Sequence, residues 1–150
     1  MNISQGEAAD IADVARLLWL MADDDERAHG TEEGFTTDLS RWWTAHHESH
    51  IVFVARLDDM EMAGVAWIAL LPRVPRPGSM QRMSADIQSV FVAPQHRGRG
   101  IGSELVDAAI EHAWRSGAMR VTVHSSSRAI PMYERLGFES SRHLLQRSPD

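Results

Sequence analysis

The sequence contains no cysteine, which excludes a disulfide framework, a thiolate metal site and a cysteine nucleophile. No apolar run approaches the length of a membrane-spanning helix, and the N-terminus lacks the basic and apolar regions of a signal peptide. No internal repeat, low-complexity tract or obvious linker interrupts the chain. We therefore expect a single domain over residues 1–150, located in the cytoplasm and long enough to bury a sizeable core.

Basic residues are fewer than acidic ones, with 15 Lys and Arg against 21 Asp and Glu. The formal net charge is −6, and acidic residues cluster at positions 23–26, 32–33 and 58–61. A chain with this balance is a poor general nucleic-acid binder, because neutralising phosphates requires a basic face. An acidic field favours a cationic small molecule instead, although such charge runs also simply keep loops and helix ends solvated.

Hydrophobic spacing and turn residues predict an alternating set of elements. After a short strand near Ile3, we expect helices over residues 7–21 and 31–47, and then a strand pair over 50–56 and 63–71. A proline-rich exposed loop should follow, and then a strand over 86–92, a helix over 101–114, a strand over 121–123 and a helix over 128–136. Two more short strands are expected within residues 138–147. This order predicts an α/β protein with a mixed sheet and helices on both faces.

The most informative segment runs from a strand through a glycine-rich turn directly into a helix. Gly98, Gly100 and Gly102 permit unusual backbone angles and the close approach of a ligand to the main chain. The first turn of a helix leaves its N–H groups unpaired at positive potential, and Arg97 and Arg99 add fixed positive charge. The segment therefore predicts a site for an anion such as a diphosphate.

Two well-known phosphate loops fit this segment poorly. The P-loop requires a lysine followed by serine or threonine after its last glycine, and neither pair is present. The dinucleotide fingerprint requires Gly or Ala where Ser103 stands, and it normally opens a Rossmann unit rather than lying two-thirds along the chain.

A closer match comes from two motifs in order. Val90-x-Val92-x-Pro94-Gln95-x-x-Gly98-x-Gly100-Ile101-Gly102 resembles the coenzyme-A signature of the GNAT superfamily of N-acetyltransferases. Downstream, Ser126-x-x-Ala129-Ile130-x-Met132-Tyr133-Glu134-x-x-Gly137-Phe138 resembles the C-terminal motif of that family. The resemblance is strong from Asp86 to Phe138 and rests on element order alone in the first half. It implies the GNAT fold, a splayed mixed sheet of about six to seven strands with helices on both faces. The cofactor would lie in a V-shaped gap between the strands ending near Val92 and Val123.

The resemblance also implies that acetyl-CoA is the co-substrate and that an amine attacks its thioester directly. Backbone groups of the strand would bind the pantetheine arm in the manner of an added strand. Backbone N–H groups of the turn and the first helical residues would hold the diphosphate, and Ser126 stands where the family commonly has asparagine. The implied cofactor-binding residues are Val90, Phe91, Val92, Arg97, Gly98, Arg99, Gly100, Ile101, Gly102, Ser103 and Ser126.

Two residues are candidates for proton transfer. Tyr133, the only tyrosine, sits where the family places its general acid, and a phenol with a pKa of about 10 stays protonated at neutral pH. Asp86 lies an even number of residues before Val90 on the same strand, so it is expected to share the face of Val90. It is a candidate base, because the histone-acetylating branch has a glutamate near this position. A solvent-facing carboxylate at the strand end is an equal interpretation.

The acceptor is expected to be a primary amine on a small molecule, drawn in by the acidic residues 23–26 if it is cationic. His46, His47 and His50 lack metal-site spacing, so no metal is expected. A protein acetyltransferase acting on lysine or an N-terminal amine, with the loop at residues 73–82 docking a peptide, stays open. So does a non-catalytic acyl-CoA sensor. Family members often dimerise, so a homodimer is among the expected states, without a nucleic-acid or membrane partner.

Overall fold

The computed structural model describes residues 1–149 and contains one five-stranded mixed sheet in the order β1-β2-β3-β4-β5. β1 to β4 pair antiparallel in succession, and β5 pairs parallel with β4. The elements are β1 (Asn2–Gln5), the 3₁₀ turn η1 (Ala8–Asp10), α1 (Ile11–Met21), α2 (Asp24–Arg27), α3 (Glu32–His46), β2 (His50–Arg56), β3 (Met62–Pro72), β4 (Met83–Val92), the 3₁₀ turn η2 (Pro94–His96), α4 (Ile101–Arg115), β5 (Ala118–Val123) and α5 (Ile130–Arg135).

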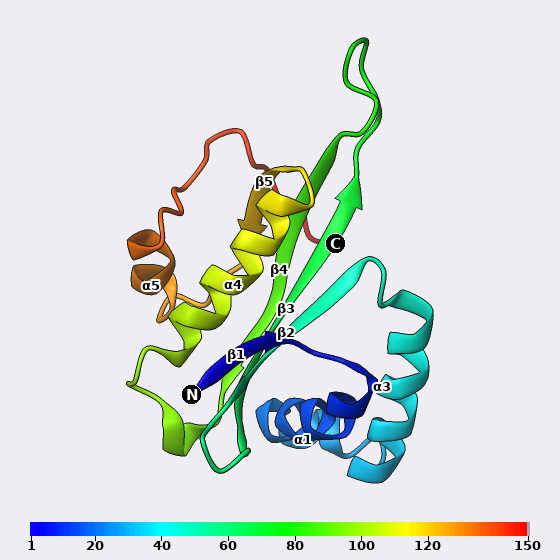
Figure 1. Cartoon of the computed structure of the whole chain (residues 1–150), viewed down its shortest axis with the longest axis vertical. Helices are drawn as coiled ribbons and strands as arrows, with labels where there is room; N and C mark the ends of the chain where they lie inside the picture. Colours follow the sequence, from blue (N-terminus) through cyan, green and yellow to red (C-terminus); the bar gives the residue numbers. More distant parts are fainter. Residues whose placement is uncertain (150) are drawn as a thin grey trace.

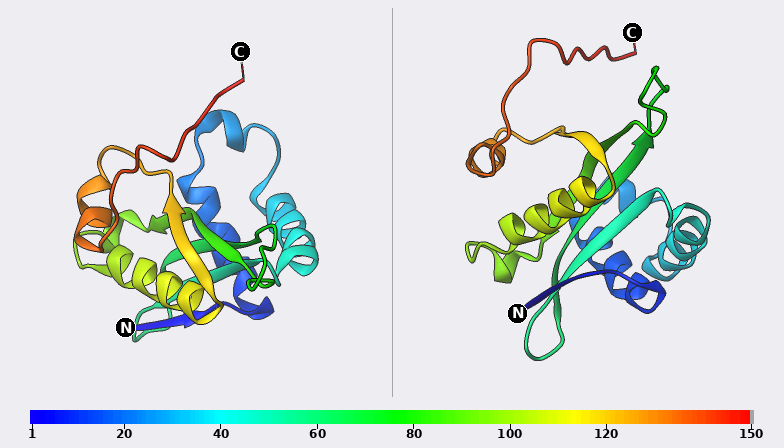
Figure 2. Two further views of the ribbon diagram at one scale, coloured as in Figure 1. Left: turned by 90° about the horizontal axis from the view of Figure 1, so that it is seen from above. Right: turned by 45° about the horizontal axis from the view of Figure 1, so that its top comes forward.

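Helices cover both faces of the sheet, as expected from the sequence. α4 crosses one face, while α1 and α3 lie on the other (Figures 1 and 2). The four-residue spacing of the apolar positions of α4 places Ile101, Leu105, Ala109 and Ala113 in the core. Among residues 1–149, no helix is long and apolar enough to cross a membrane.

Strand alternation divides the core into two layers. On β2, Ile51 and Phe53 pack with Leu105 of α4 in one layer. Val52 and Val54 pack with Leu17 of α1 in the other layer. We call these the α4 side and the α1 side of the sheet.

β4 changes faces part-way along its length. Ala85 and Ile87 pack on the α4 side, so Asp86 between them faces the α1 side. The pairing then jumps from Ile87 opposite Ile68 to Ser89 opposite Trp67, which leaves Gln88 as a bulge without a partner on β3. Beyond the bulge, Val90 packs on the α4 side. The expectation that Asp86 shares a face with Val90 is therefore wrong, because a two-residue period fails across a bulge.

The C-terminal region also differs from the sequence expectation. The sheet has five strands rather than six or seven, and residues 138–149 contain no strand or helix. Figure 2 shows this segment leading away from the sheet. Its adjacent apolar residues, Leu144 and Leu145, are exposed. Because neighbouring strand residues point to opposite faces, this pair lacks the alternation that buries one face of a strand.

Candidate active site

The sheet opens between β4 and β5. The two strands pair only from Met83 opposite Ala118 to Ile87 opposite Val123, where β5 ends. β4 continues to Val92, so residues 88–92 have no strand beside them on that edge within the described chain. These unpaired residues of β4 lie where the V-shaped gap was expected, and we call the space beside this edge the gap.

Backbone direction decides which residues of β4 face this gap. The N–H of Ala93 donates to Ala63 O on β3 at 2.8 Å. Since alternate residues of a strand direct their N–H and C=O groups to opposite edges, Val90 and Val92 turn theirs toward the gap. Phe91 does not: its backbone turns toward β3 and its side chain is buried on the α1 side. Phe91 was expected to bind the cofactor, and the structure instead gives it a packing position.

Arg97 fixes the end of this edge. Its Nε donates to Val92 O at 3.0 Å, and its guanidinium lies over the Phe91 ring, 5.5 Å from the ring centroid. The side chain therefore lies back along β4 and places its positive charge beside the last residues of that strand. The Val92 carbonyl, which was predicted to bind pantetheine, therefore already accepts a hydrogen bond from Arg97.

The glycine-rich turn presents open main chain. Gly98 and Gly100 both have φ of +78°, a conformation that favours glycine, and a Cβ built on either would meet no atom within 4 Å. Gly100 precedes α4 without a side-chain cap, and the first hydrogen bond into the helix is Glu104 N–H to Gly100 O at 3.1 Å. The N–H groups of residues 101–103 thus point out of an uncapped helix end with positive potential. These residues fit a diphosphate such as that of coenzyme A.

Tyr133 lies beside this helix end. α5 packs on the first turn of α4, where a Cβ at Gly102 would lie 3.5 Å from Met132 Sδ. Tyr133 belongs to the α4-side core, is 7% exposed, and meets the Phe138 ring edge-on with centroids 5.3 Å apart. Burial raises the pKa of Tyr133 above its ordinary value. The phenol therefore stays protonated at neutral pH.

Asp86 occupies the opposite face. The hydroxyl of Thr122 on β5 donates to Asp86 Oδ1 at 2.9 Å, one residue before the strands separate. Beyond the bulge, Ser89 also faces the α1 side, with its Oγ 3.9 Å from Met21 Sδ at the end of α1. Ser89 was not among the expected site residues, since no sequence signal reveals the bulge that turns it toward α1.

Comparison with known proteins identifies the arrangement. The model of the acetyltransferase (GNAT) family matches residues 14–138. The chain belongs to the acetyltransferase (GNAT) family.

Individual members are similar over different lengths. A glucosamine 6-phosphate N-acetyltransferase of Trypanosoma brucei brucei is 33% identical over 85 residues, which are 57% of this chain and 56% of that protein. An acetyltransferase structure from Trypanosoma brucei superposes with a TM-score of 0.78 and 22% identity over 99% of both chains. A predicted acetyltransferase from Clostridium acetobutylicum with acetyl-CoA gives a TM-score of 0.71 at 17% identity, over 98% of this chain and 95% of that one. These two likenesses show the fold. The chain spans about half the length, 45–56%, of the relatives matched by sequence.

The other predicted residues of this GNAT chain have local roles. Ser126 lies exposed in the loop between β5 and α5, and its carbonyl accepts from Ser125 Oγ at 2.7 Å. Asp23 and Glu26 cap α2 reciprocally: the Glu26 N–H donates to Asp23 Oδ1 at 2.8 Å, and the Asp23 N–H donates to Glu26 Oε1 at 3.0 Å. Two residues of the acidic run at 23–26 therefore stabilise the start of α2. The attraction of this run for a cationic acceptor stays a prediction.

The histidines near the end of α3 form an aromatic group rather than a ligand set. The His46 ring stacks on Trp42 with centroids 4.5 Å apart, and His50 meets Trp42 edge-on at 5.0 Å. Across residues 1–149, no three His, Cys, Asp or Glu side chains are arranged to hold a metal ion.

Proposed function

We propose that this chain transfers an acetyl group from acetyl-CoA to the primary amine of an acceptor. The observation that carries the proposal is the exposed edge of β4 leading directly into the uncapped start of α4. Backbone groups of Val90 and Val92 would bind the pantetheine arm, and the N–H groups around Gly98 to Ser103 would hold the diphosphate. When bound, acetyl-CoA supplies an acyl carbonyl activated by a thiol leaving group.

The two candidate proton-transfer residues approach the gap from opposite faces of the sheet. Tyr133 lies on the α4 side, where its protonated hydroxyl can donate to the departing sulfur. Asp86 faces the α1 side, where the acceptor would enter. An amine with a pKa of about 10.4 costs roughly 4–5 kcal/mol to present unprotonated at neutral pH, so a nearby carboxylate that accepts its proton assists attack. Acid and base are then separated by the thioester, as direct attack requires.

The Asp86 assignment has its own test. Asp86→Asn keeps an acceptor for the Thr122 hydroxyl but does not take up a proton. If Asp86 is the base, kcat/KM should fall most at neutral pH and recover as the pH approaches the pKa of the amine. Thr122→Val, which removes the hydroxyl beside Asp86, is the matched control for a change in carboxylate position. A uniform loss of rate at every pH would contradict the assignment.

A thiol-release assay with acetyl-CoA tests the proposed function. The acceptor panel should contain small monoamines, polyamines, an amino sugar and its phosphate, and peptides with a free N-terminus or an internal lysine. Neutralising Asp24 and Asp25, whose side chains are exposed, should raise KM for polyamines if the acidic segment attracts cations. Unchanged KM at low salt would rule that attraction out.

The non-catalytic sensor is distinguished by binding without turnover. Calorimetry with coenzyme A measures the binding step by itself. Coenzyme A binding without thiol release from any acceptor would favour the sensor, whereas no uptake of coenzyme A would contradict the proposed site. The cytoplasmic location and the homodimer expected from the sequence stay predictions.

A further inference from the structure

The connection between β3 and β4 forms an arm, residues 71–82, that extends beyond the sheet at the top of Figure 1. The strand ladder continues into it, because Arg73 N–H donates to Arg82 O at 2.8 Å. Arg76 and Ser79 close its tip with reciprocal hydrogen bonds of 3.0 and 2.8 Å. In a chain with a net charge of −6, this arm contains three arginines and no acidic residue.

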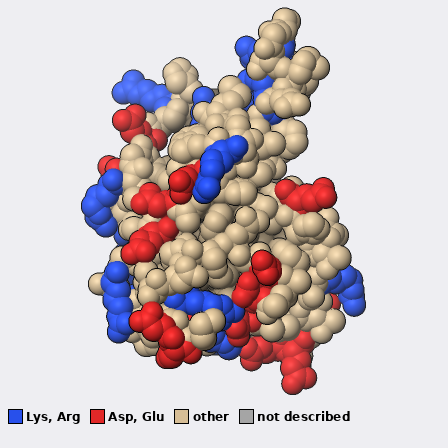
Figure 3. All heavy atoms as spheres, in the orientation of Figure 1, with Lys and Arg blue, Asp and Glu red and all other residues tan. Residues whose placement is uncertain are grey.

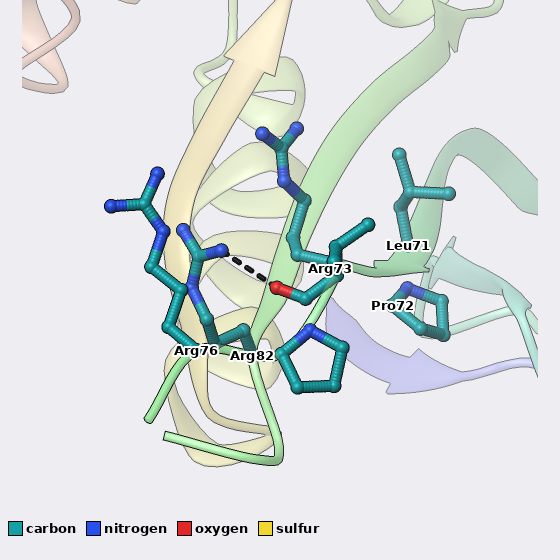
Figure 4. A pocket seen from close by; sticks show the side chains of 7 residues that line it. Leu71, Pro72, Arg73, Arg76 and Arg82 are labelled. Atoms are coloured by element: carbon teal, nitrogen blue, oxygen red, sulfur yellow. Dashed lines mark hydrogen bonds between the residues drawn. The ribbon is translucent and has the colours of Figure 1, made fainter. Parts of the chain in front are cut away.

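The three arginines share one hollow. Arg73, Arg76 and Arg82 line an open depression of about 410 Å³ together with Leu71, Pro72, Val74 and Pro75. Figure 4 shows their side chains extending in the same general direction, with Arg82 Nη1 donating to Val74 O at 2.8 Å. That hydrogen bond fixes one guanidinium at the wall of the depression.

Within the described residues, no carboxylate pairs with these guanidinium groups. On the face drawn in Figure 3, basic side chains lie on the arm, and the acidic ones are spread over the rest of the molecule. Like charges around one depression repel each other, so an anionic ligand that enters it is attracted by all three.

Strand alternation places Arg73 and Arg82 on the α1 side of the sheet, where the proposed acceptor would enter. Leu70 and Ala85 pack on the α4 side, so the next residues outward that face the α1 side include Arg73 and Arg82. This is the face that Asp86 occupies. A ligand bound in the depression can therefore continue along β4 toward the gap without crossing the sheet.

Length decides what kind of acceptor can use both places. Arg82, just before β4, and Ser89 lie opposite Arg73 and Trp67, so with the bulge discounted they are six strand residues apart, or about 20 Å at roughly 3.3 Å per residue. A phosphorylated amino sugar is far shorter than that span, whereas about six residues of extended polypeptide match it. The arm also exposes Leu71, Val74 and Met80 by 55%, 81% and 71%, which gives apolar contacts that a polypeptide can use.

We propose that the arm binds an acidic stretch of a polypeptide acceptor whose amine is acetylated at the gap. This inference rests on the proposed function and names its substrate class. The acidic side chains would lie about five to seven residues from the reacting amine, in contact with the guanidinium groups of the arm.

Matched peptides test the inference. Each has a free N-terminal amine and the same neutral first four residues, followed by three glutamates in one peptide and three glutamines in the other. At low salt, kcat/KM should be about 10-fold higher for the acidic peptide, because two or three exposed charge pairs each contribute modestly. The preference should shrink as ionic strength rises.

The variant is Arg73→Gln with Arg76→Gln, which spares Arg82 and its hydrogen bond to the arm. It should bring the ratio of acidic to neutral peptide close to one. Arg142→Gln, an exposed arginine in the C-terminal segment, makes the same kind of charge change and should keep the wild-type ratio. Thermal unfolding of both variants checks that the fold is retained.

Three results would overturn the inference: no preference in the wild type, a preference that survives the double substitution, or an equal loss of turnover with glucosamine 6-phosphate. The last would assign the arm to small anions. If no amine is acetylated at all, the proposed function fails by itself. In that case, fluorescence anisotropy with the labelled acidic peptide tests whether the arm binds it. The inference requires that the wild type binds this peptide and that the double variant binds it at least fivefold more weakly.

Discussion

Tyr133→Phe removes a single oxygen atom from a side chain that is 7% exposed. Burial alone accounts for the raised pKa of this phenol, and no residue within 1–149 hydrogen-bonds its hydroxyl. Its removal therefore leaves no partner unsatisfied, and the free energy of unfolding should change by less than about 0.5 kcal/mol. Turnover should fall much more, since the departing thiolate loses its proton donor.

The size of the loss follows from the leaving group. General acids contribute about 10²–10⁴-fold, and a thiol with a pKa of about 8.5 needs less help than an alcohol. We therefore expect the lower end, a 10²-fold loss of kcat/KM, equivalent to about 2.7 kcal/mol in the activation barrier. Because the pKa of Tyr133 is raised, the phenol stays protonated at every pH below about 10. Its ionisation should therefore not lower the wild-type rate in that pH range.

Steady-state thiol release and thermal unfolding, measured on the same preparations, check this prediction. Phe138→Leu is the matched control, because it removes the ring that meets Tyr133 edge-on but keeps the hydroxyl. It should lower stability by about 1 kcal/mol with a small effect on rate. Wild-type activity in Tyr133→Phe, or an equal rate loss in Phe138→Leu, would refute general acid catalysis by this residue.

Three further predictions concern the turn, a strained residue and pH. Gly100→Ala places a residue with a side chain at φ of +78°, at a cost of about 1–2 kcal/mol. It should lower the thermal unfolding midpoint and weaken coenzyme A binding measured by calorimetry. Gly30→Ala is the control and should change neither quantity. Met60 has φ of +72° and is exposed, so Met60→Gly should raise the free energy of unfolding by roughly 0.5–1 kcal/mol in urea titrations, and a gain in Met60→Ala would contradict this cause. Burial lowers the pKa of His50 and of His112, so the stability that their neutral forms support is present above about pH 6.5 and is lost as pH falls through their lowered values. Urea unfolding should show this loss as the pH falls below about 6.5, and His112→Leu should reduce it; an unchanged loss would remove His112 from the explanation.

Local signals predicted most of the architecture. Thr31 accepts a hydrogen bond from Gly34 N–H at 3.0 Å, and α3 begins directly after it, as the Thr-Glu-Glu signal indicates. α4 follows its four-residue apolar spacing, and Gly117, with φ of +88°, marks its end. The glycine-rich turn was also predictable from local residue types, because glycine adopts the positive φ that Gly98 and Gly100 have in the structure.

Features that depend on tertiary pairing were not predictable. α2 forms because Asp23 and Glu26 cap each other, whereas the same acids look like a pattern break in the sequence. Residues 73–82 look like an irregular loop because of their prolines, although the hydrogen bond from Arg73 to Arg82 extends the hairpin ladder into them. The predicted strands after Phe138 lacked the alternation that would have supported them.

The bulge at Gln88 connects the missed features of the site to one cause. A bulge disrupts the ladder, bends its strand and increases local twist. Pairing with β5 ends at Ile87, the residue immediately before Gln88, so the opening of the sheet coincides with the bulge. The same extra residue reverses the alternation, which leaves Asp86 facing the α1 side and Val90 packing on the α4 side. One inserted residue therefore coincides with the start of the edge that a cofactor arm can use, and it accounts for the opposite faces of Asp86 and Val90.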